Sequence, residues 1–399
     1  MKKVVRVKLT PTPAQAASLA ATLLLCNTGS NHAAQVAFER RTPAGRTPRR
    51  FDLQKIVYGD LKTMGLSAQT AVRAIKKTVD AYTTLRANIR AGNLGAQGSP
   101  RRVKAESKPI TFRPAAAHPF DDRCLSWDHT AQTVSIWTVD GRIRDIAYTG
   151  RGADLLILAA RRKGESDLVC TDGQWYLIAT IDIPDVPVTE PAGWVGVDLG
   201  IVNLATTSDT TGAPGMNFSG GAVTNRRKKN VLLRAKLQAK GTKSAKRLLR
   251  KRSKKETRFV KDVNHQISKR IVAEAKRTAR GIAIEDLSGI RARVRLRKPQ
   301  RAAVHSWAFA QLGTFLTYKA AAAGVALVQV DPAYTSQTCS GCGHVSRQNR
   351  PNQASFACRA CGVLLHADHN AAVNIAHRGE DGWGEINRPR AHPPVSHAA

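Results

Sequence analysis

The chain has 399 residues, of which 42% are hydrophobic and 5% aromatic. This composition is typical of a folded protein with two or three domains and a sizeable core. Lysine and arginine total 63 against 29 aspartates and glutamates, so the formal net charge is +34. Such an excess repels itself in a compact chain, which argues against a role without a polyanionic partner. We expect that partner to be nucleic acid.

An anionic membrane is the alternative partner for this charge, but the sequence contains no long apolar span. The longest apolar run, residues 16–26, is short and is interrupted by Ser18 and Thr22. A signal peptide is not expected either, because the first residues alternate like a strand. Four of the seven cysteines are clustered and three are scattered, which suits a reducing compartment such as the cytoplasm. The scattered cysteines are Cys26, Cys124 and Cys170.

The N-terminal part begins with a predicted strand and at least two predicted helices. Residues 3–9 alternate between apolar and basic side chains, which indicates a half-buried strand. Thr12 and Pro13 then form a plausible helix cap and first helical residue. A clearer helix is predicted between Ser67 and Gly92, because its apolar residues share one face. These residues are Val72, Ile75, Val79, Tyr82 and Ile89.

A β-rich segment follows. Residues 92–119 are rich in Gly, Ala, Pro and basic residues, so we expect a linker or loop there. Two predicted hairpins come next, one turning at Asp140-Gly141 and the other at Asp172-Gly173. They predict a small antiparallel β-unit, with a barrel as one candidate form, that takes in the N-terminal strand. The prolines in residues 184–191 mark a second boundary.

The second half of the chain alternates strands with helices. Residues 194–208 predict a buried strand, a glycine turn and a second strand. Residues 226–261 contain seventeen Lys/Arg and a single acid, Glu256, which predicts a basic helical hairpin too strongly charged to be a solvated face alone. An amphipathic helix, a strand ending at Glu285-Asp286, an Arg-rich loop at residues 291–301, a further helix and a further strand are predicted to follow.

Two cysteine pairs form the most specific local pattern in the chain. Cys339-x2-Cys342 and Cys358-x2-Cys361 are separated by fifteen residues. This spacing lets two tight knuckles present four thiolates to one tetrahedral Zn²⁺. Four cysteine ligands leave no open position for catalysis, so we predict a structural zinc ion.

Three acids stand in positions that are unusual for a soluble protein. Asp198 lies inside an apolar strand, Glu285 ends another, and Asp368 opens a helix after the cysteine pairs. A carboxylate in a buried strand is costly unless it is paired or holds a metal ion. Three such oxygen donors can converge on two Mg²⁺ ions, which would activate water for phosphodiester cleavage.

Each of these acids taken alone has an ordinary explanation. An aspartate before glycine is most often a turn residue, and Asp286 competes with Glu285 for the role of ligand. The order of the elements is more specific: a strand carrying an acid, a strand, basic helices, a strand ending in an acid, a helix, a strand and a helix opening on an acid. This order suggests a ribonuclease H-like core.

Several segments resemble TnpB proteins, which are transposon-encoded RNA-guided nucleases related to compact type V CRISPR effectors. The resemblance covers most of residues 190–377 and is weaker in the N-terminal half. The segments are GVDLGIVNLAT, GIAIEDLSGI, HSWAFAQLGTFLTYKAAAAGV, DPAYTSQTCSGCGHVSRQNR and FACRACGVLLHADHNAAVNI.

The resemblance implies an α/β multidomain protein with an RNase H-like (RuvC) nuclease core and an inserted zinc ribbon. It also implies an N-terminal β-barrel-like wedge domain that carries a helical recognition insert. The expected ranges are 1–11 and 93–190 for the wedge, 12–92 for the insert, 191–334 and 363–378 for the core, 335–362 for the ribbon and 379–399 for a disordered tail.

The resemblance also implies roles for the marked residues. Asp198, Glu285 and Asp368 occupy its catalytic positions and would hold two Mg²⁺ ions, while the ribbon cysteines hold structural Zn²⁺. The implied activity is cleavage of double-stranded target DNA in this single site. The implied partners are a guide RNA, whose base pairing reads the target, and a short DNA motif beside the target that the protein itself reads.

Two other functions are compatible with the same fold, namely an RNA-guided repressor that does not cleave and a cut-and-paste transposase. The presence of all three acids weighs against the repressor. Three ribbon arginines, Arg347, Arg350 and Arg359, either load DNA into the site or are merely solvated.

Overall fold

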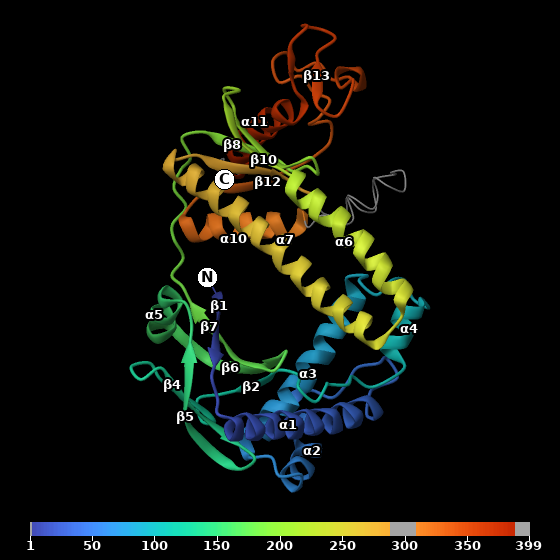
Figure 1. Ribbon diagram of the computed structural model, residues 1–399, viewed down its shortest axis with the longest axis vertical. Coiled ribbons are helices and arrows are strands. Elements are labelled where there is room, and N and C mark those ends of the chain that lie inside the picture. Colours follow the sequence, from blue (N-terminus) through green and yellow to red (C-terminus); the bar gives the residue numbers. More distant parts are fainter. Residues whose placement is uncertain (1, 288–308, 388–399) are drawn as a thin grey trace, which may run out of the picture. The chain divides into compact units, whose positions relative to one another are not determined.

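The computed structural model describes residues 2–287 and 309–387 of the chain. It divides the chain into two units, Met1–Pro184 and Asp185–Ala399, which we describe separately (Figure 1). No helix in the described ranges is long and apolar enough to cross a membrane. The predicted Arg-rich loop at residues 291–301 and the last part of the predicted tail lie outside the described residues.

Three helices form one part of the first unit: α1 (Pro13–Glu39), α2 (Arg50–Thr63) and α3 (Ala68–Arg90). The predicted start of α1 is confirmed. The Thr12 hydroxyl accepts the Gln15 backbone N–H, and the Gln15 side chain accepts that of Thr12, which is a capping box. The predicted helix after Ser67 is also confirmed. These helices bury their own apolar cluster, including Leu53, Leu61 and Ile75.

The first unit also contains two short helices that the sequence did not indicate. α4 (Pro100–Glu106) lies inside the segment that we expected to be a loop, where Pro100 occupies the first helical position. α5 (Gly152–Arg161) connects two strands and buries Leu158 against the sheet. Both are too short to show a helical repeat of apolar residues, which is why periodicity did not reveal them.

The sheet of the first unit has seven antiparallel strands in the order β2-β6-β7-β1-β5-β4-β3. The strands are β1 (Lys2–Leu9), β2 (His118–Phe120), β3 (Leu125–Asp128), β4 (Thr133–Thr138), β5 (Gly141–Thr149), β6 (Arg162–Thr171) and β7 (Gln174–Asp182). Both predicted hairpins and the inclusion of the N-terminal strand are confirmed. Edge strands β2 and β3 are consecutive in the chain, and the short link between them spans at most about 17 Å. The sheet must therefore curl until its two edges approach each other.

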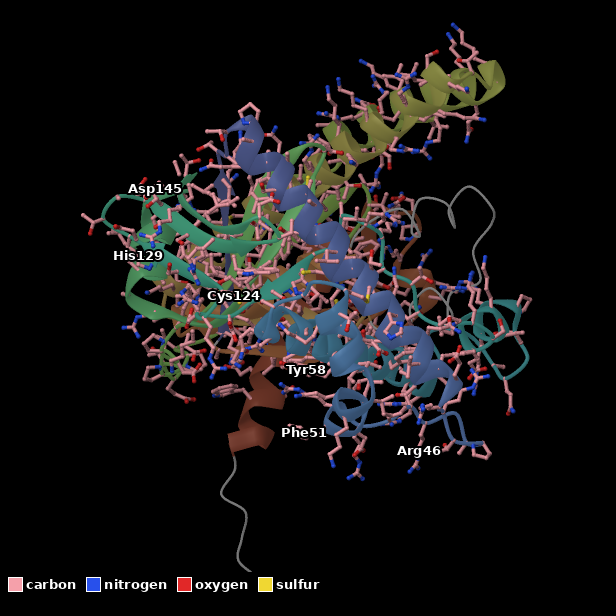
Figure 2. All side chains as sticks on the ribbon, turned by 90° about the horizontal axis from the view of Figure 1, so that it is seen from below. Arg46, Phe51, Tyr58, Cys124, His129 and Asp145 are labelled. Atoms are coloured by element: carbon pink, nitrogen blue, oxygen red, sulfur yellow. The ribbon has the colours of Figure 1, made fainter. Side chains whose placement is uncertain are left out.

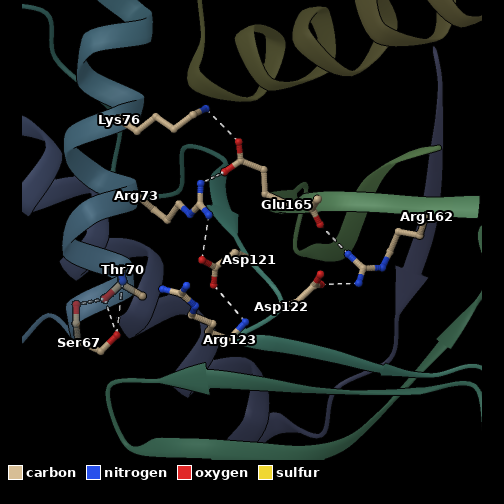
Figure 3. A network of polar contacts seen from close by, with 10 residues as sticks. Ser67, Thr70, Arg73, Lys76, Asp121, Asp122, Arg123, Arg162 and Glu165 are labelled. Carbon is tan, nitrogen blue, oxygen red and sulfur yellow. Dashed lines mark hydrogen bonds and ion pairs between the residues drawn. The ribbon is translucent and has the colours of Figure 1, made fainter. Parts of the chain in front are cut away.

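A network of ion pairs joins α3 to this sheet (Figure 3). Arg73 donates to Asp121 at 2.8 Å and to Glu165 at 2.7 Å, and Lys76 donates to Glu165 at 2.9 Å. Asp122, which follows Asp121 in the chain, forms a further ion pair with Arg162. The Arg73 and Asp121 side chains are largely buried, so this network fixes the helical part to the β-part.

The second unit is built on a five-stranded mixed sheet with the order β10-β9-β8-β11-β12. Its strands are β8 (Trp194–Asp198), β9 (Asn203–Asp209), β10 (Pro214–Ser219), β11 (Gly281–Glu285) and β12 (Leu327–Val330). β8, β11 and β12 are mutually parallel, β9 pairs antiparallel with β8, and β10 pairs antiparallel with β9, so β9 is the strand of this sheet that runs opposite to the other four. The predicted strands are confirmed, and β10 was not predicted.

Helices cover both faces of this sheet. On one face, α7 (Lys243–Arg277) and α10 (Phe309–Ala323) bury a cluster that includes Ile267, Leu312 and Ile284. On the other face, α11 (Ala367–Asn387) packs directly on the strands. The central strands are therefore buried on both sides, as their continuous apolar sequence requires.

The predicted basic helical hairpin is confirmed as α6 (Gly221–Lys240) and α7, with the turn at Gly241 in the left-handed region (φ +63°). We expected a separate amphipathic helix after residue 261, and that boundary is wrong because α7 is continuous. No glycine or proline interrupts residues 243–277, so nothing stops the helix. Its first half is basic and mostly exposed, and its second half carries the buried face.

The disordered tail was predicted to start at residue 379, but α11 continues to Asn387. The Trp383 ring packs 5.6 Å from that of Trp194, and the indole N–H donates to Glu190 Oε1 at 2.9 Å. These contacts give the last turns of α11 a packed face, which the glycine-rich sequence did not reveal. Between β12 and α11 lie the short strands β13 (Ser355–Ala357) and β14 (Leu364–His366) of the cysteine segment.

Candidate active site

Two of the predicted acids lie side by side at the carboxyl ends of parallel strands. β8 and β11 pair with Ile284 opposite Val197, so the next residues, Asp198 and Glu285, are neighbours across the two strands. Paired strands lie about 4.8 Å apart, and side chains alternate between faces. Both carboxylates therefore point to the sheet face that also carries Gly196, the face covered by α11.

A glycine brings α11 against that face. A Cβ atom on Gly196 would lie 1.9 Å from the Ala372 carbonyl oxygen and 2.5 Å from the Ala376 nitrogen, so only glycine permits this approach. Asp368 lies four residues before Ala372, one turn nearer the start of α11. Because Asp198 is two residues beyond Gly196 along the strand, the helix places Asp368 over the end of β8.

The electrostatics show that the three acids interact. The pKa of Asp198 is raised to about 8, first by burial and then by the nearby charges of Glu285 and Asp368, against a smaller opposing effect of Arg350. Burial likewise raises the pKa of Glu285, although a hydrogen bond from Thr335 opposes this. The site therefore concentrates carboxylates in a poorly solvated place, which favours either protonation or a bound cation.

Hydrogen bonds orient two of the carboxylates. The Asn203 amide donates to Asp368 Oδ2 at 2.9 Å, and the Thr335 hydroxyl donates to Glu285 Oε1 at 2.5 Å. The Arg350 guanidinium lies 3.6 Å from Asp368 Oδ1. Asn203 and Thr335 were not singled out from the sequence, because their importance depends on neighbours that only the fold brings close.

The other candidate residues lie at or away from this centre. Asp286 follows the end of β11, where its backbone N–H donates to the Val330 carbonyl. It also lines, with Glu285, a cavity of about 390 Å³ between the carboxyl ends of the parallel strands and α10. Arg347 and Arg359 have exposed side chains, so of the three ribbon arginines the structure brings only Arg350 to the acids.

Hard oxygen donors of this kind are what Mg²⁺ prefers, so the residues present fit that ion chemically. In the described part of the chain, however, only the four ribbon cysteines form a group of three or more ligand atoms lying within 4.8 Å of one another. The three carboxylates thus form a wider group than a site for one shared ion would need.

The four cysteine thiols converge as the sequence predicted. The Cys339 and Cys361 sulfurs are 3.7 Å apart, and those of Cys342 and Cys358 are 3.5 Å apart. Tetrahedral Zn²⁺ with bonds of about 2.3 Å places its sulfurs about 3.8 Å apart, so the cluster fits a structural zinc ion.

The two knuckles share one backbone pattern. The Cys339 carbonyl accepts the N–H of Gly343, and the Cys358 carbonyl accepts that of Gly362. Both glycines have a positive φ, +73° and +75°. This conformation favours glycine, which explains its place after each pair.

Helix α11 is tied to the first knuckle by two buried asparagines. Asn370 accepts the Ser340 N–H at 2.9 Å and donates to the Thr338 carbonyl at 2.8 Å. Asn374 donates to the carbonyls of Thr335 and Thr338. The helix that carries Asp368 therefore also supports the cysteine cluster, and the two candidate metal centres share one structural element.

Comparison with known proteins matches both regions to described families. Residues 178–289 match the family described as "Probable transposase", and residues 309–375 match "Cas12f1-like, TNB domain". The CRISPR-associated endodeoxyribonuclease Cas12f1 of Sulfoacidibacillus thermotolerans is 32% identical over 246 residues, covering 57% of each chain. The putative RNA-guided DNA endonuclease InsQ of Escherichia coli K12 is 28% identical over 226 residues, covering 52% of this chain and 54% of its own.

The predicted resemblance to TnpB proteins and compact type V effectors is thereby confirmed. The chain spans about half the length of the curated relatives that it matches. Among solved structures, the mini-RNA-guided endonuclease CRISPR-Cas_phi3 covers 98% of this chain and 94% of its own, with a TM-score of 0.50 and 10% identity. That likeness supports a common fold with the compact Cas12 effectors.

Proposed function

We propose that the protein is an RNA-guided DNA endonuclease, on the premise that residues 178–289 match the family described as "Probable transposase" and residues 309–375 match "Cas12f1-like, TNB domain". It would bind a guide RNA, recognise a short motif beside the target, and hydrolyse the backbone of double-stranded DNA in one RuvC-like site. The observation that carries the proposal is the meeting of Asp198, Glu285 and Asp368 at one end of a mixed sheet.

We assign the catalytic role to these three carboxylates. Asp198 and Glu285 would hold metal ions from the sheet, and Asp368 from the start of α11. Mg²⁺ ions bound there would supply polarisation of the phosphate and a lowered pKa of a water molecule. The wide spacing of the carboxylates suits two ions better than one.

The remaining residues would orient the reacting groups. Asn203 and Thr335 fix the rotation of Asp368 and Glu285 through the hydrogen bonds described above. Arg350 lies close enough to Asp368 to contact a phosphate oxygen that approaches the same carboxylate. In the overall reaction water supplies a hydroxyl to phosphorus and a proton to the departing sugar oxygen.

The basic hairpin of α6 and α7 would contact the nucleic acid backbone. Within residues 226–261 of this hairpin the one acid is Glu256, which already pairs with Arg234 at 3.2 Å. The first unit would supply the wedge-like domain (1–11 and 93–190) and the recognition insert (12–92). Such a protein would act on DNA in the cytoplasm of a prokaryotic cell.

The test is a cleavage assay with the full chain and the RNA that co-purifies with it. That RNA is sequenced, and a plasmid library carrying its complement beside randomised flanking bases is incubated with the complex and Mg²⁺. We expect cleavage by the unaltered protein and by the exposed-surface control Asp381→Asn. Asp198→Asn should bind the plasmid without cutting it.

Three outcomes would contradict the proposal. Undiminished cleavage by Asp198→Asn would remove the carboxylate from the reaction. Target binding without cleavage by the unaltered protein would identify a repressor. Strand joining in place of hydrolysis would identify a transposase.

A further inference from the structure

A second cavity, of about 720 Å³, lies in the first unit among the ends of α1, α3 and α4 and the loop after α1. This volume is within the range of pockets that bind small molecules. The lining includes five cationic side chains and one acid, Glu106. The cations are Arg41, Arg86, Arg90, Arg102 and Lys108.

Two of these arginines are held in place by neutral groups. The Arg41 guanidinium carbon lies 3.7 Å from the centre of the Phe38 ring, and one of its N–H groups donates to the Glu106 backbone carbonyl at 3.1 Å. Arg86 donates to the hydroxyls of Thr47 at 3.1 Å and Thr83 at 3.2 Å. Neutral acceptors fix a guanidinium without cancelling its charge, so both arginines are pre-organised for an anion.

The single acid of the cavity is already engaged. The Glu106 carboxylate accepts from Arg102 at 3.1 Å, one helical turn away. In the described part of the chain, Arg90 and Lys108 form no ion pair within 4.0 Å. Four positive charges therefore face the cavity without a carboxylate partner there, which favours a ligand with more than one negative oxygen.

The cavity also has an apolar wall. Leu85 and Ile89 lie on the same face of α3 as Arg86 and Arg90, and Phe38 lies beneath Arg41. A bare phosphate ion would leave this wall without a contact. A phosphate attached to a flat, largely apolar group would use both the cations and the wall.

We propose that this cavity binds a nucleotide, with Arg41, Arg86 and Lys108 on its phosphate and the Leu85–Ile89 wall against its base. The ligand's chemistry is a phosphate joined to a nucleobase, supplied either by one nucleotide of a strand or by a free nucleotide. The proposal deepens the proposed function, because it rests on the expectation of an RNA partner and names one place where that RNA is held.

The test compares two double variants of the full chain. Arg86→Gln/Lys108→Gln removes two charges from the cavity. Arg46→Gln/Lys104→Gln removes two exposed charges of the same unit that do not line it; Arg46 is labelled on the loop after α1 in Figure 2. Binding of a 5′-labelled 20-nucleotide RNA of mixed sequence is followed by fluorescence anisotropy at 0.15 M salt without Mg²⁺. We expect about tenfold weaker binding for the cavity variant and less than twofold for the control.

Crosslinking gives a second readout that does not depend on charge. An RNA containing 4-thiouridine is irradiated with the protein, and the attached peptides are identified by mass spectrometry. Crosslinks within residues 38–47 or 82–108 are expected, and they should disappear in the cavity variant. Millimolar AMP that removes these crosslinks would identify a free nucleotide as the ligand, whereas their persistence would identify the strand.

Equal losses of affinity in the two double variants, or crosslinks confined to the second unit, would overturn the proposal. If Arg86→Gln/Lys108→Gln does not fold because the Arg86 hydrogen bonds are lost, Arg90→Gln/Lys108→Gln replaces it as the cavity variant. Since binding is measured without Mg²⁺, a failure of the endonuclease assignment leaves this result unchanged. Asp198→Asn should bind the RNA like the unaltered protein.

Discussion

Gly196 sets the distance between α11 and the sheet, and with it the position of Asp368. Its absent side chain is as important to the site as the carboxylates, because any Cβ would meet the Ala372 carbonyl oxygen at 1.9 Å. The role of a small residue of this kind is invisible in a single sequence, where GVDLG is equally well explained by a turn.

Gly196→Ala should therefore destabilise the protein by about 1–3 kcal/mol or more, because α11 must move away from β8. Gly382→Ala is a matched control in α11 itself: no atom lies within 4 Å of the added Cβ, and the change should raise stability by up to about 1 kcal/mol. Urea unfolding of both variants measures the difference. A Gly196→Ala protein as stable as the unaltered one would mean that the helix does not lie on the strand.

The Asp198 carboxyl also gives a pH dependence whose sign is fixed. Its pKa is about 8 in the fold and about 3.9 in an unfolded chain, so the fold retains a proton that the unfolded chain has lost. The free energy of unfolding of the Mg²⁺-free protein should therefore fall as the pH rises from about 4 to about 8. Asp198→Asn should flatten this slope between pH 5 and 8. Identical slopes in urea titrations, made in buffer freed of Mg²⁺ with zinc retained, would contradict the buried position of this carboxyl.

At the scale of elements, the cysteine segment and α11 form one assembly. The spacing of the two cysteine pairs was enough to predict the cluster, because a tetrahedral Zn²⁺ allows few alternatives. The sequence could not show that Asn370 and Asn374 join this cluster to α11. Such contacts are non-local, and asparagines in a helix carry no signature of their partners.

Cys358→Ser/Cys361→Ser should reduce the zinc content from one ion per chain to none, as measured by mass spectrometry of the metal. The variant should also lose stability, because the second knuckle would no longer be held to the first. Cys170→Ser, which alters a partly buried cysteine of the first unit, should keep its zinc. Zinc retained in the double variant would rule out the four-thiol site.

The basic hairpin was predictable as an element but not in its length. Its charge and its leucines indicated two helices, and the turn at Gly241 is where they separate. The continuity of α7 depends on packing of its second half against the sheet and α10, which local sequence cannot reveal.

Removing charge from this hairpin should weaken nucleic acid binding and its salt dependence together. For a single-stranded RNA, each lost phosphate contact lowers the slope of log K against log salt by about 0.7. If Lys251→Gln/Lys255→Gln removes one or two phosphate contacts, this slope should fall by about 0.7 to 1.4. Lys2→Gln/Lys8→Gln should leave the slope unchanged. Equal slopes for both variants in anisotropy titrations would show that the hairpin is only a solvated surface.

At the scale of the whole molecule, the sequence indicated the α/β class, both hairpins, the acids and the cysteine cluster. It missed α2, α4, α5, β2, β3, β10, β13 and β14, which are short or lack a clear apolar repeat. It also placed the end of α11 too early, because glycines around Trp383 suggested a tail. The assignment of residues 1–190 to wedge and recognition domains remains a prediction.

The proposed endonuclease activity requires Asp198, Glu285 and Asp368 to form one metal centre. Diffraction from crystals of the protein soaked in Mn²⁺, recorded at the manganese absorption edge, tests this most directly. We predict two anomalous peaks about 3.5–4 Å apart among the three carboxylates, in addition to the zinc among the cysteines. An absence of manganese at these carboxylates in the unaltered protein, with the ion bound elsewhere, would contradict the account.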